Sequence, residues 1–85
     1  MTLDWANAVG LLGSALFLAA FAYANASPKM DKVWFNAANL VGSALLLASL
    51  SVHFNLAAFV LEACWAVIAL LGLVKALRER KAARP

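Results

Sequence analysis

Three long apolar runs dominate this chain of 85 residues and limit what it can fold into. They cover roughly residues 4–24, 33–52 and 56–77. Each is about twenty residues long, which is the length of helix that crosses a hydrocarbon core of about 30 Å. A soluble bundle would need polar faces, but 66% of the residues are hydrophobic, against about 45–50% in a typical soluble domain. We therefore expect an all-α fold, a three-helix transmembrane bundle.

The segments between the runs support this division of the chain. Residues 25–32 contain Ser27-Pro28, which disfavours a continuous helix, and three charged side chains that need water. The second break, at residues 53–55, leaves room only for a short turn. We expect one membrane domain over residues 1–85, with a short basic tail at 78–85.

The basic residues indicate the orientation in the membrane. All seven lie either in the first linker or at the C-terminal end, which three spans place on the same side of the bilayer. Lys and Arg are concentrated on the cytoplasmic side of membrane proteins. We expect a multi-pass protein of the bacterial inner membrane, with the N-terminus outside and the C-terminus in the cytoplasm. These residues are Lys29, Lys32, Lys75, Arg78, Arg80, Lys81 and Arg84.

The same placement accounts for the net charge of +3, so nucleic-acid binding is not expected. The N-terminus carries Asp4, which suits a helix N-cap, and no Lys or Arg before the first run. A cleaved signal peptide normally has a positive segment there, so we expect the first run to be a retained span.

The first two runs share an internal repeat. Trp5-Ala6-Asn7-Ala8 matches Trp34-Phe35-Asn36-Ala37, and Leu11–Ala19 matches Leu40–Ala48 at the same offset. Because consecutive spans run in opposite directions, this is a small inverted repeat, an arrangement that transporters use on a larger scale.

Helical spacing places the polar and small residues of the repeat on one face of each span. In lipid, such faces normally form helix–helix seams, because small residues allow close approach and polar ones bond across it. Contact with a ligand is the alternative. The two faces consist of Asn7, Gly10 and Ser14 in the first span and Asn36, Asn39 and Ser43 in the second.

Glu62 is a carboxylate within the third run, on the order of 10 Å from its outer end at 1.5 Å per residue. A charge in the membrane costs roughly 3 kcal/mol on insertion scales, so such a residue usually has a partner or a task. Glu62 shares a stripe with small residues and should face protein. Because no basic residue is available within the membrane to pair with Glu62, we expect a neutral acid that donates to Asn7, Ser14, Ser49 or a backbone carbonyl.

We expect a substrate or ion site around Glu62. His53 and Asn55, at the outer mouth, would relay protons or anchor the turn, and Trp65 would pack over the seam or line a cavity. The structural alternative is a neutral Glu62 that holds the bundle or an oligomer together. The candidate binding residues are Glu62, His53, Asn55, Asn7, Asn39, Ser43 and Trp65.

Other chemistry is not indicated. A lone His53 and a lone Cys64 give no metal site, and the glycines form no phosphate-binding loop. We expect neither a catalytic residue nor a cofactor, and no enzymatic activity.

The block Asn39–Leu47, followed by His53-Phe54-Asn55 and by Phe59–Glu62 with Trp65, resembles a family of small uncharacterised bacterial membrane proteins. Its members have about this length and three spans, and they are often labelled permease or transporter. The resemblance covers nearly the whole chain. It implies an inner-membrane location and brings no activity or catalytic residues.

A weaker resemblance is to SemiSWEET proteins, the bacterial three-helix half-transporters for sugars. Size, span count and the basic first linker agree. Their Pro-Gln pair, expected late in the first span, is missing, and Leu18-Ala19-Ala20-Phe21 stands in that region. The resemblance therefore implies the architecture and not sugar transport.

Three spans enclose little volume, so a transport path would need at least a dimer. The leading hypothesis is an oligomeric permease-type carrier with Glu62 as its coupling or binding carboxylate. The alternatives are an accessory subunit of a larger membrane complex and a scaffold whose basic tail contacts anionic headgroups.

Overall fold

The computed structural model describes residues 4–83, which form three helices. They are α1 (Trp5–Ala26), α2 (Lys32–Leu50) and α3 (Leu56–Ala83). The predicted all-α fold is confirmed, and each helix is long and apolar enough to cross a membrane. The third helix continues beyond residue 77, so the described part of the expected basic tail is helical.

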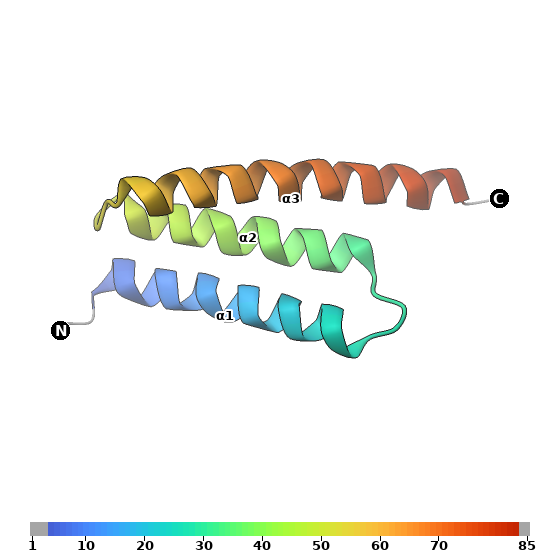
Figure 1. Ribbon diagram of the computed structural model, residues 1–85, viewed down its shortest axis with the longest axis horizontal. Coiled ribbons are helices and arrows are strands. Elements are labelled where there is room, and N and C mark those ends of the chain that lie inside the picture. Colours follow the sequence, from blue (N-terminus) through green and yellow to red (C-terminus); the bar gives the residue numbers. More distant parts are fainter. Residues whose placement is uncertain (1–3, 84–85) are drawn as a thin grey trace.

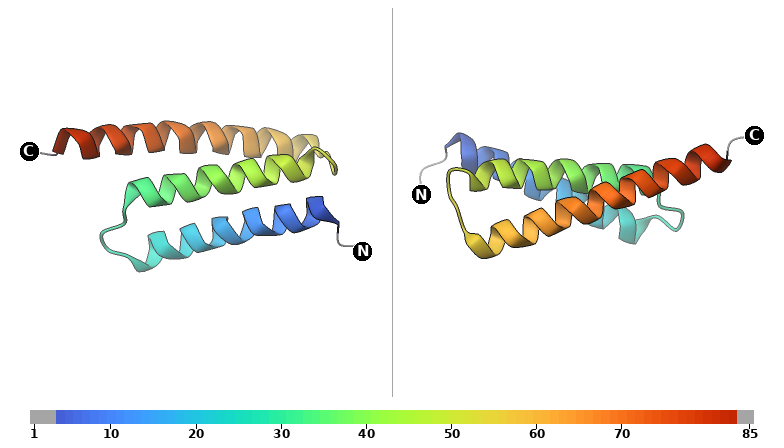
Figure 2. Two further views of the ribbon diagram at one scale, coloured as in Figure 1. Left: turned by 180° about the vertical axis from the view of Figure 1, so that it is seen from behind. Right: turned by 90° about the horizontal axis from the view of Figure 1, so that it is seen from above.

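The three helices lie side by side with α2 in the middle (Figure 1). Within the described residues, α2 packs against both neighbours, whereas no Cα atoms of α1 and α3 approach within 8 Å. Seen from above, α3 crosses α2 at an angle (Figure 2). The described chain starts and ends at opposite ends of the bundle, as three spans require (Figure 1).

The helix starts follow from local sequence. The Asp4 carboxylate accepts a hydrogen bond from the Asn7 N–H at 2.8 Å, and Asp31 accepts one from the Val33 N–H at 2.9 Å. Both carboxylates are therefore N-caps, satisfying N–H groups that have no partner within the first helical turn. α1 ends before Pro28, a residue that cannot donate a backbone hydrogen bond to continue it.

The seam between α1 and α2 is built on two glycines that correspond in the repeat. A Cβ at Gly13 would lie 2.8 Å from the Gly42 carbonyl oxygen, and one at Gly42 would lie 3.1 Å from that of Gly13. Leu46 packs on Gly13, and Phe17, its counterpart in the repeat, packs on Gly42. The contact of Leu46 with Gly13 is therefore equivalent to the contact of Phe17 with Gly42 when α1 and α2 are exchanged. The repeat forms an antiparallel pair related by a local two-fold axis.

Large apolar side chains are exposed along all three helices, and the buried core consists of small residues. Such a surface would be an aggregation hazard in water, but it suits contact with acyl chains. The structure therefore fits a small membrane protein. The exposed side chains include Leu11, Leu18, Phe21, Val41, Leu61, Ile68 and Leu71.

A side-chain contact joins separate elements at each end of the bundle. At the end where α1 begins, His53 Nε2 lies 3.0 Å from Asp4 Oδ2. At the other end, one guanidinium nitrogen of Arg80 lies 2.8 Å from both carboxylate oxygens of Asp31. The Asp31 N–H also donates to the Tyr23 hydroxyl at 2.6 Å, which links α1 to the start of α2. These contacts hold the linkers against the helix ends.

The Asp31–Arg80 pair predicts a pH-dependent stability. Burial tends to raise the pKa of Asp31, but the Val33 N–H and Arg80 outweigh it and hold that pKa below its usual range. A lowered pKa in the folded state stabilises the fold above the unfolded pKa of about 4, and that contribution is lost as the pH falls further. We expect Asp31→Asn, which keeps the cap, to lower the thermal unfolding temperature in detergent at pH 6. The difference from wild type should shrink as the pH falls below about 4 and through the lowered pKa of Asp31. A difference that stays constant over that fall in pH would contradict the ion-pair explanation.

Candidate functional site

Polar residues of α2 and α3 meet in the seam between these helices. Trp65 Nε1 donates to Asn39 Oδ1 at 3.0 Å, and the Asn39 Nδ2 donates to the Phe35 carbonyl at 2.8 Å. Asn39 is only 6% exposed. Its amide is therefore fixed on both sides, and it holds the indole of Trp65 against α2.

One turn away lie two buried oxygen atoms that have no hydrogen-bond partner in the described residues, Ser43 Oγ and Glu62 Oε2. The Ser43 side chain is completely buried. Ser43 follows Asn39 by four residues and Glu62 precedes Trp65 by three. Because α2 and α3 are antiparallel, both steps lead in the same direction along the bundle. The hydroxyl and the carboxyl group therefore sit at one level of the seam.

Each of these groups has hydrogen-bonding capacity to offer to a small polar ligand. A protonated Glu62 can donate a hydrogen bond and an ionised one can only accept, whereas a hydroxyl can do either. A buried polar atom without a partner costs about 1–3 kcal/mol, so such atoms call for a functional or a solvent explanation. Ser43 and Glu62 are thus the centre of the candidate site.

The structure gives His53 and Asn55 partners other than Glu62. His53 pairs with Asp4, and Asn55 caps α3 by accepting the Ala58 N–H at 3.1 Å. Asn7 lies in the first turn of α1, whereas Glu62 belongs to α3, which packs on α2.

Two hydroxyls expected as partners of Glu62 have other neighbours. The Ser14 hydroxyl donates to the Gly10 carbonyl at 2.9 Å within its own helix. Ser49 packs against Gly10, where an added Cβ would lie 2.8 Å from its Oγ. Within the described residues, no hydrogen bond joins Glu62 to Ser14 or Ser49, and no Cα atoms of α1 and α3 approach within 8 Å.

Phe17 is a contributor that the sequence analysis did not single out. Its ring centroid lies 5.7 Å from that of Trp65, which bridges α1 to α3 across the face of α2. Phe17 and Phe21 recur at helical spacing, the signal that could have indicated an aromatic wall. A groove of about 450 Å³ opens beside them, lined by Phe17, Leu18, Phe21, Phe35, Asn39 and Trp65.

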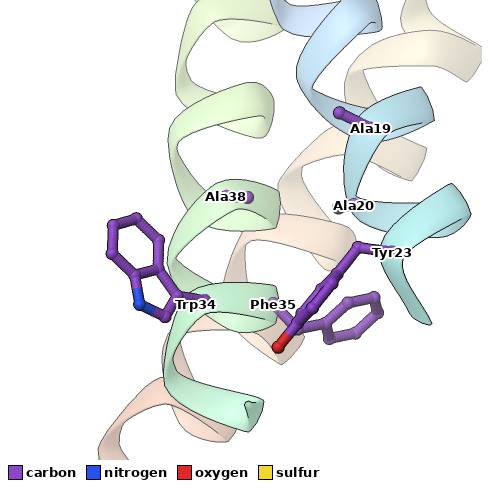
Figure 3. A pocket seen from close by; sticks show the side chains of 6 residues that line it. All are labelled: Ala19, Ala20, Tyr23, Trp34, Phe35 and Ala38. Atoms are coloured by element: carbon purple, nitrogen blue, oxygen red, sulfur yellow. The ribbon is translucent and has the colours of Figure 1, made fainter. Parts of the chain in front are cut away.

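A second groove, of about 300 Å³, lies between α1 and α2 near the first linker (Figure 3). Its walls include Tyr23, whose hydroxyl accepts the Asp31 N–H. Apart from Tyr23 and the indole N–H of Trp34 its lining is apolar, so it suits an acyl chain better than a polar ligand. Its other lining residues are Ala19, Ala20, Trp34, Phe35 and Ala38.

A comparison with protein families places these features in a wider group. A family model matches residues 6–81 and so includes every candidate site residue. The chain belongs to that family. The family is uncharacterised, and its membership brings no activity or substrate. No curated protein and no solved structure matches the chain. The function of this family member must therefore be argued from its own site.

The Trp65–Asn39 hydrogen bond gives a test of the site's architecture in this family member. Trp65→Phe keeps an aromatic ring beside Phe17 but leaves the buried Asn39 oxygen without its donor. We expect a loss of about 1–2 kcal/mol in unfolding free energy, measured by circular dichroism during titration of a mild detergent with SDS. Trp34→Phe is the control, because that indole is 71% exposed. Equal losses in both variants would contradict the inferred role of the bond.

Proposed function

We propose that this protein is an oligomeric permease-type carrier of the bacterial inner membrane, in which Glu62 is the coupling or binding carboxylate. The observation that carries the proposal is the buried, unpartnered Oε2 of Glu62 inside α3, at the level of the unpartnered and fully buried Ser43 Oγ. Ionisable groups inside membrane spans commonly mark ion or substrate pathways.

The electrostatic setting supports a group that changes its protonation state. The described basic side chains lie in the first linker, at the start of α2 or in the last turns of α3, away from Glu62. Glu62 therefore has no cation to neutralise it permanently within the seam. A carboxyl group in that position can take up a proton from one side of the membrane and release it only when water or a ligand reaches it.

The packing supports an oligomer. The helices lie in a row with α1 and α3 on opposite flanks of α2, so one copy encloses no path across the membrane. A second copy placed against this row would provide the missing wall. The proposal assigns no enzymatic step, no metal and no cofactor to the site.

Mass measurement and a flux assay test this proposal. The protein is purified alone in mild detergent, its mass is determined, and it is reconstituted into liposomes with an imposed pH gradient. We expect a defined homo-oligomer and an uptake of protons, detected with a pH-sensitive dye, that exceeds that of empty liposomes. A monomer without flux that co-purifies with a larger complex would support the rival proposal, an accessory subunit, and would refute the carrier.

The proposed orientation is tested separately, with the N-terminus outside and the C-terminus in the cytoplasm. A phosphatase that is active only outside the cytoplasm is fused after Pro85 in one version and before the first residue in another. We expect activity from the N-terminal fusion alone. Activity from the C-terminal fusion would overturn the orientation without bearing on the role of Glu62.

A further inference from the structure

The C-terminal end of α3 projects beyond the rest of the bundle (Figures 1 and 2). The helix has 28 residues, whereas α2 has 19. At 1.5 Å per residue, α3 is about 42 Å long and exceeds a hydrocarbon core of about 30 Å by roughly eight residues. Counted from Leu56, the helix leaves the core near Lys75. Its last turns therefore lie at the depth of the lipid headgroups.

Three cations on these turns point away from the bundle. The face of α3 that packs on α2 is marked by Ala69 and Ala76, which are 3% and 7% exposed. At 100° per residue, Arg78 lies 200° from Ala76, on the opposite side of the helix. Lys75 and Lys81 precede and follow Arg78 by three residues, so they flank it on that side. The three side chains form a continuous outer strip, Lys75, Arg78 and Lys81, and all are exposed.

The neighbouring charges of α3 are used differently. Arg80 turns inward to the carboxylate of Asp31, which fixes the rotation of the helix end relative to α2. Glu79 lines a small crevice of about 220 Å³ together with Lys32 and Arg80. Within the described residues, Asp31 pairs with Arg80 and Asp4 contacts His53, and neither contact involves the outer strip. Its three positive charges are therefore free to meet an outside partner.

We propose that the outer strip Lys75, Arg78 and Lys81 is a binding surface for the phosphate headgroups of anionic phospholipids. The strip has the depth of the headgroups, it faces the surrounding lipid, and its charge is complementary to theirs. The long aliphatic parts of Lys and Arg can lie along apolar surface while their charged ends reach the phosphates. Each basic residue near an anionic membrane surface strengthens attraction by about fivefold in affinity.

Lipid titration of the purified full-length protein tests this surface. Native mass spectrometry from a non-ionic detergent measures the dissociation constant of added phosphatidylglycerol and, in parallel, of phosphatidylcholine. The test variant is Arg78→Gln/Lys81→Gln. The matched control is Lys29→Gln/Lys32→Gln, which removes the same number of charges near the same end of the bundle but not from the strip. Circular dichroism checks that both variants keep the helical content of the wild type.

We expect the wild type to prefer phosphatidylglycerol, and the strip variant to bind it about thirtyfold more weakly, with no change for phosphatidylcholine. The control should lose less than about threefold. Equal losses of affinity for phosphatidylglycerol in both variants would show that binding depends only on net charge, and would overturn the proposal. So would a lack of preference for phosphatidylglycerol, or full competition by inorganic phosphate at the same concentration as the lipid. Retention of lipid binding together with loss of a co-purifying acidic protein would assign the strip to that protein instead.

Discussion

Gly13→Leu is expected to abolish the packing of α1 against α2. A Cβ at this position would meet the Gly42 carbonyl oxygen at 2.8 Å, and a backbone atom cannot turn aside as a side chain does. The two helices would have to separate along the whole seam, which also contains Phe17 and Leu46. Overpacking of a well-filled core costs about 1–3 kcal/mol for added methylenes, and backbone contact raises that cost. We expect the unfolding free energy to fall by more than about 3 kcal/mol.

SDS titration followed by circular dichroism measures this loss, with Ala15→Leu as the matched control. Ala15 lies on the same helix but is exposed, so its larger replacement meets lipid or detergent and should leave stability nearly unchanged. Gly10→Ala should fall between the two, because the nearest atom it meets is the Ser49 hydroxyl oxygen, which can rotate away, while the Ser49 Cβ lies farther off at 3.2 Å. If both leucine variants unfolded at the same SDS fraction, the glycine seam would not be what joins the helices.

Glu62→Gln is expected to reduce pH-driven flux in proteoliposomes by at least about tenfold, the equivalent of about 1.4 kcal/mol at the rate-limiting step. Gln has nearly the same shape and can form neutral hydrogen bonds, but it can neither bind nor release a proton at ordinary pH. Loss of flux without loss of structure would therefore isolate the proton chemistry of the side chain. Stability in SDS titration should change little, because a neutral carboxylic acid and an amide have similar size and similar hydrogen-bonding capacity within the seam.

Glu79→Gln is the control for this experiment. It makes the same chemical change on the same helix, but at an exposed position in the last turns of α3. Its flux should match that of the wild type. Full flux in Glu62→Gln would refute the role of Glu62 in coupling. The remaining role of Glu62 would then be a structural one, in the packing of the helices. Loss of both flux and stability in that variant would favour the same structural role.

Much of the fold could be predicted from local features of the sequence. The apolar runs predicted the three helices, because only a helix satisfies every backbone group within a single span. Asp4 was recognisable as a cap, and the Trp-x-Asn-Ala repeat indicated an inverted pair. The sequence placed the end of the third apolar run near residue 77 and a basic tail after it, but it did not indicate that the helix continues through residues 78–83. Those residues are good helix formers, and they leave the membrane without leaving the helix.

The candidate site was only partly accessible from the sequence. Glu62 stood out because a carboxylate in a membrane span is rare. The neighbours of Glu62 could not be predicted in the same way. Asn39 and Trp65 are 26 positions apart in the sequence, and their hydrogen bond depends on how α3 packs against α2. Hydrogen bonds from Glu62 to α1 would require the backbones of α1 and α3 to lie close together. In the described residues, no Cα atoms of these two helices approach within 8 Å, although the rings of Phe17 and Trp65 meet.

The sequence by itself determined that this chain forms three helices long and apolar enough to span a membrane, with one carboxylate inside a span and a basic end, since these follow from the length and polarity of each run. Only the tertiary structure decided which helices touch, which oxygens remain without a partner, and which cations face outward. The physical reason is that these helices are apolar nearly all round. Periodicity then cannot indicate which side packs, and the choice depends on the close fit of small residues such as Gly13 against Gly42.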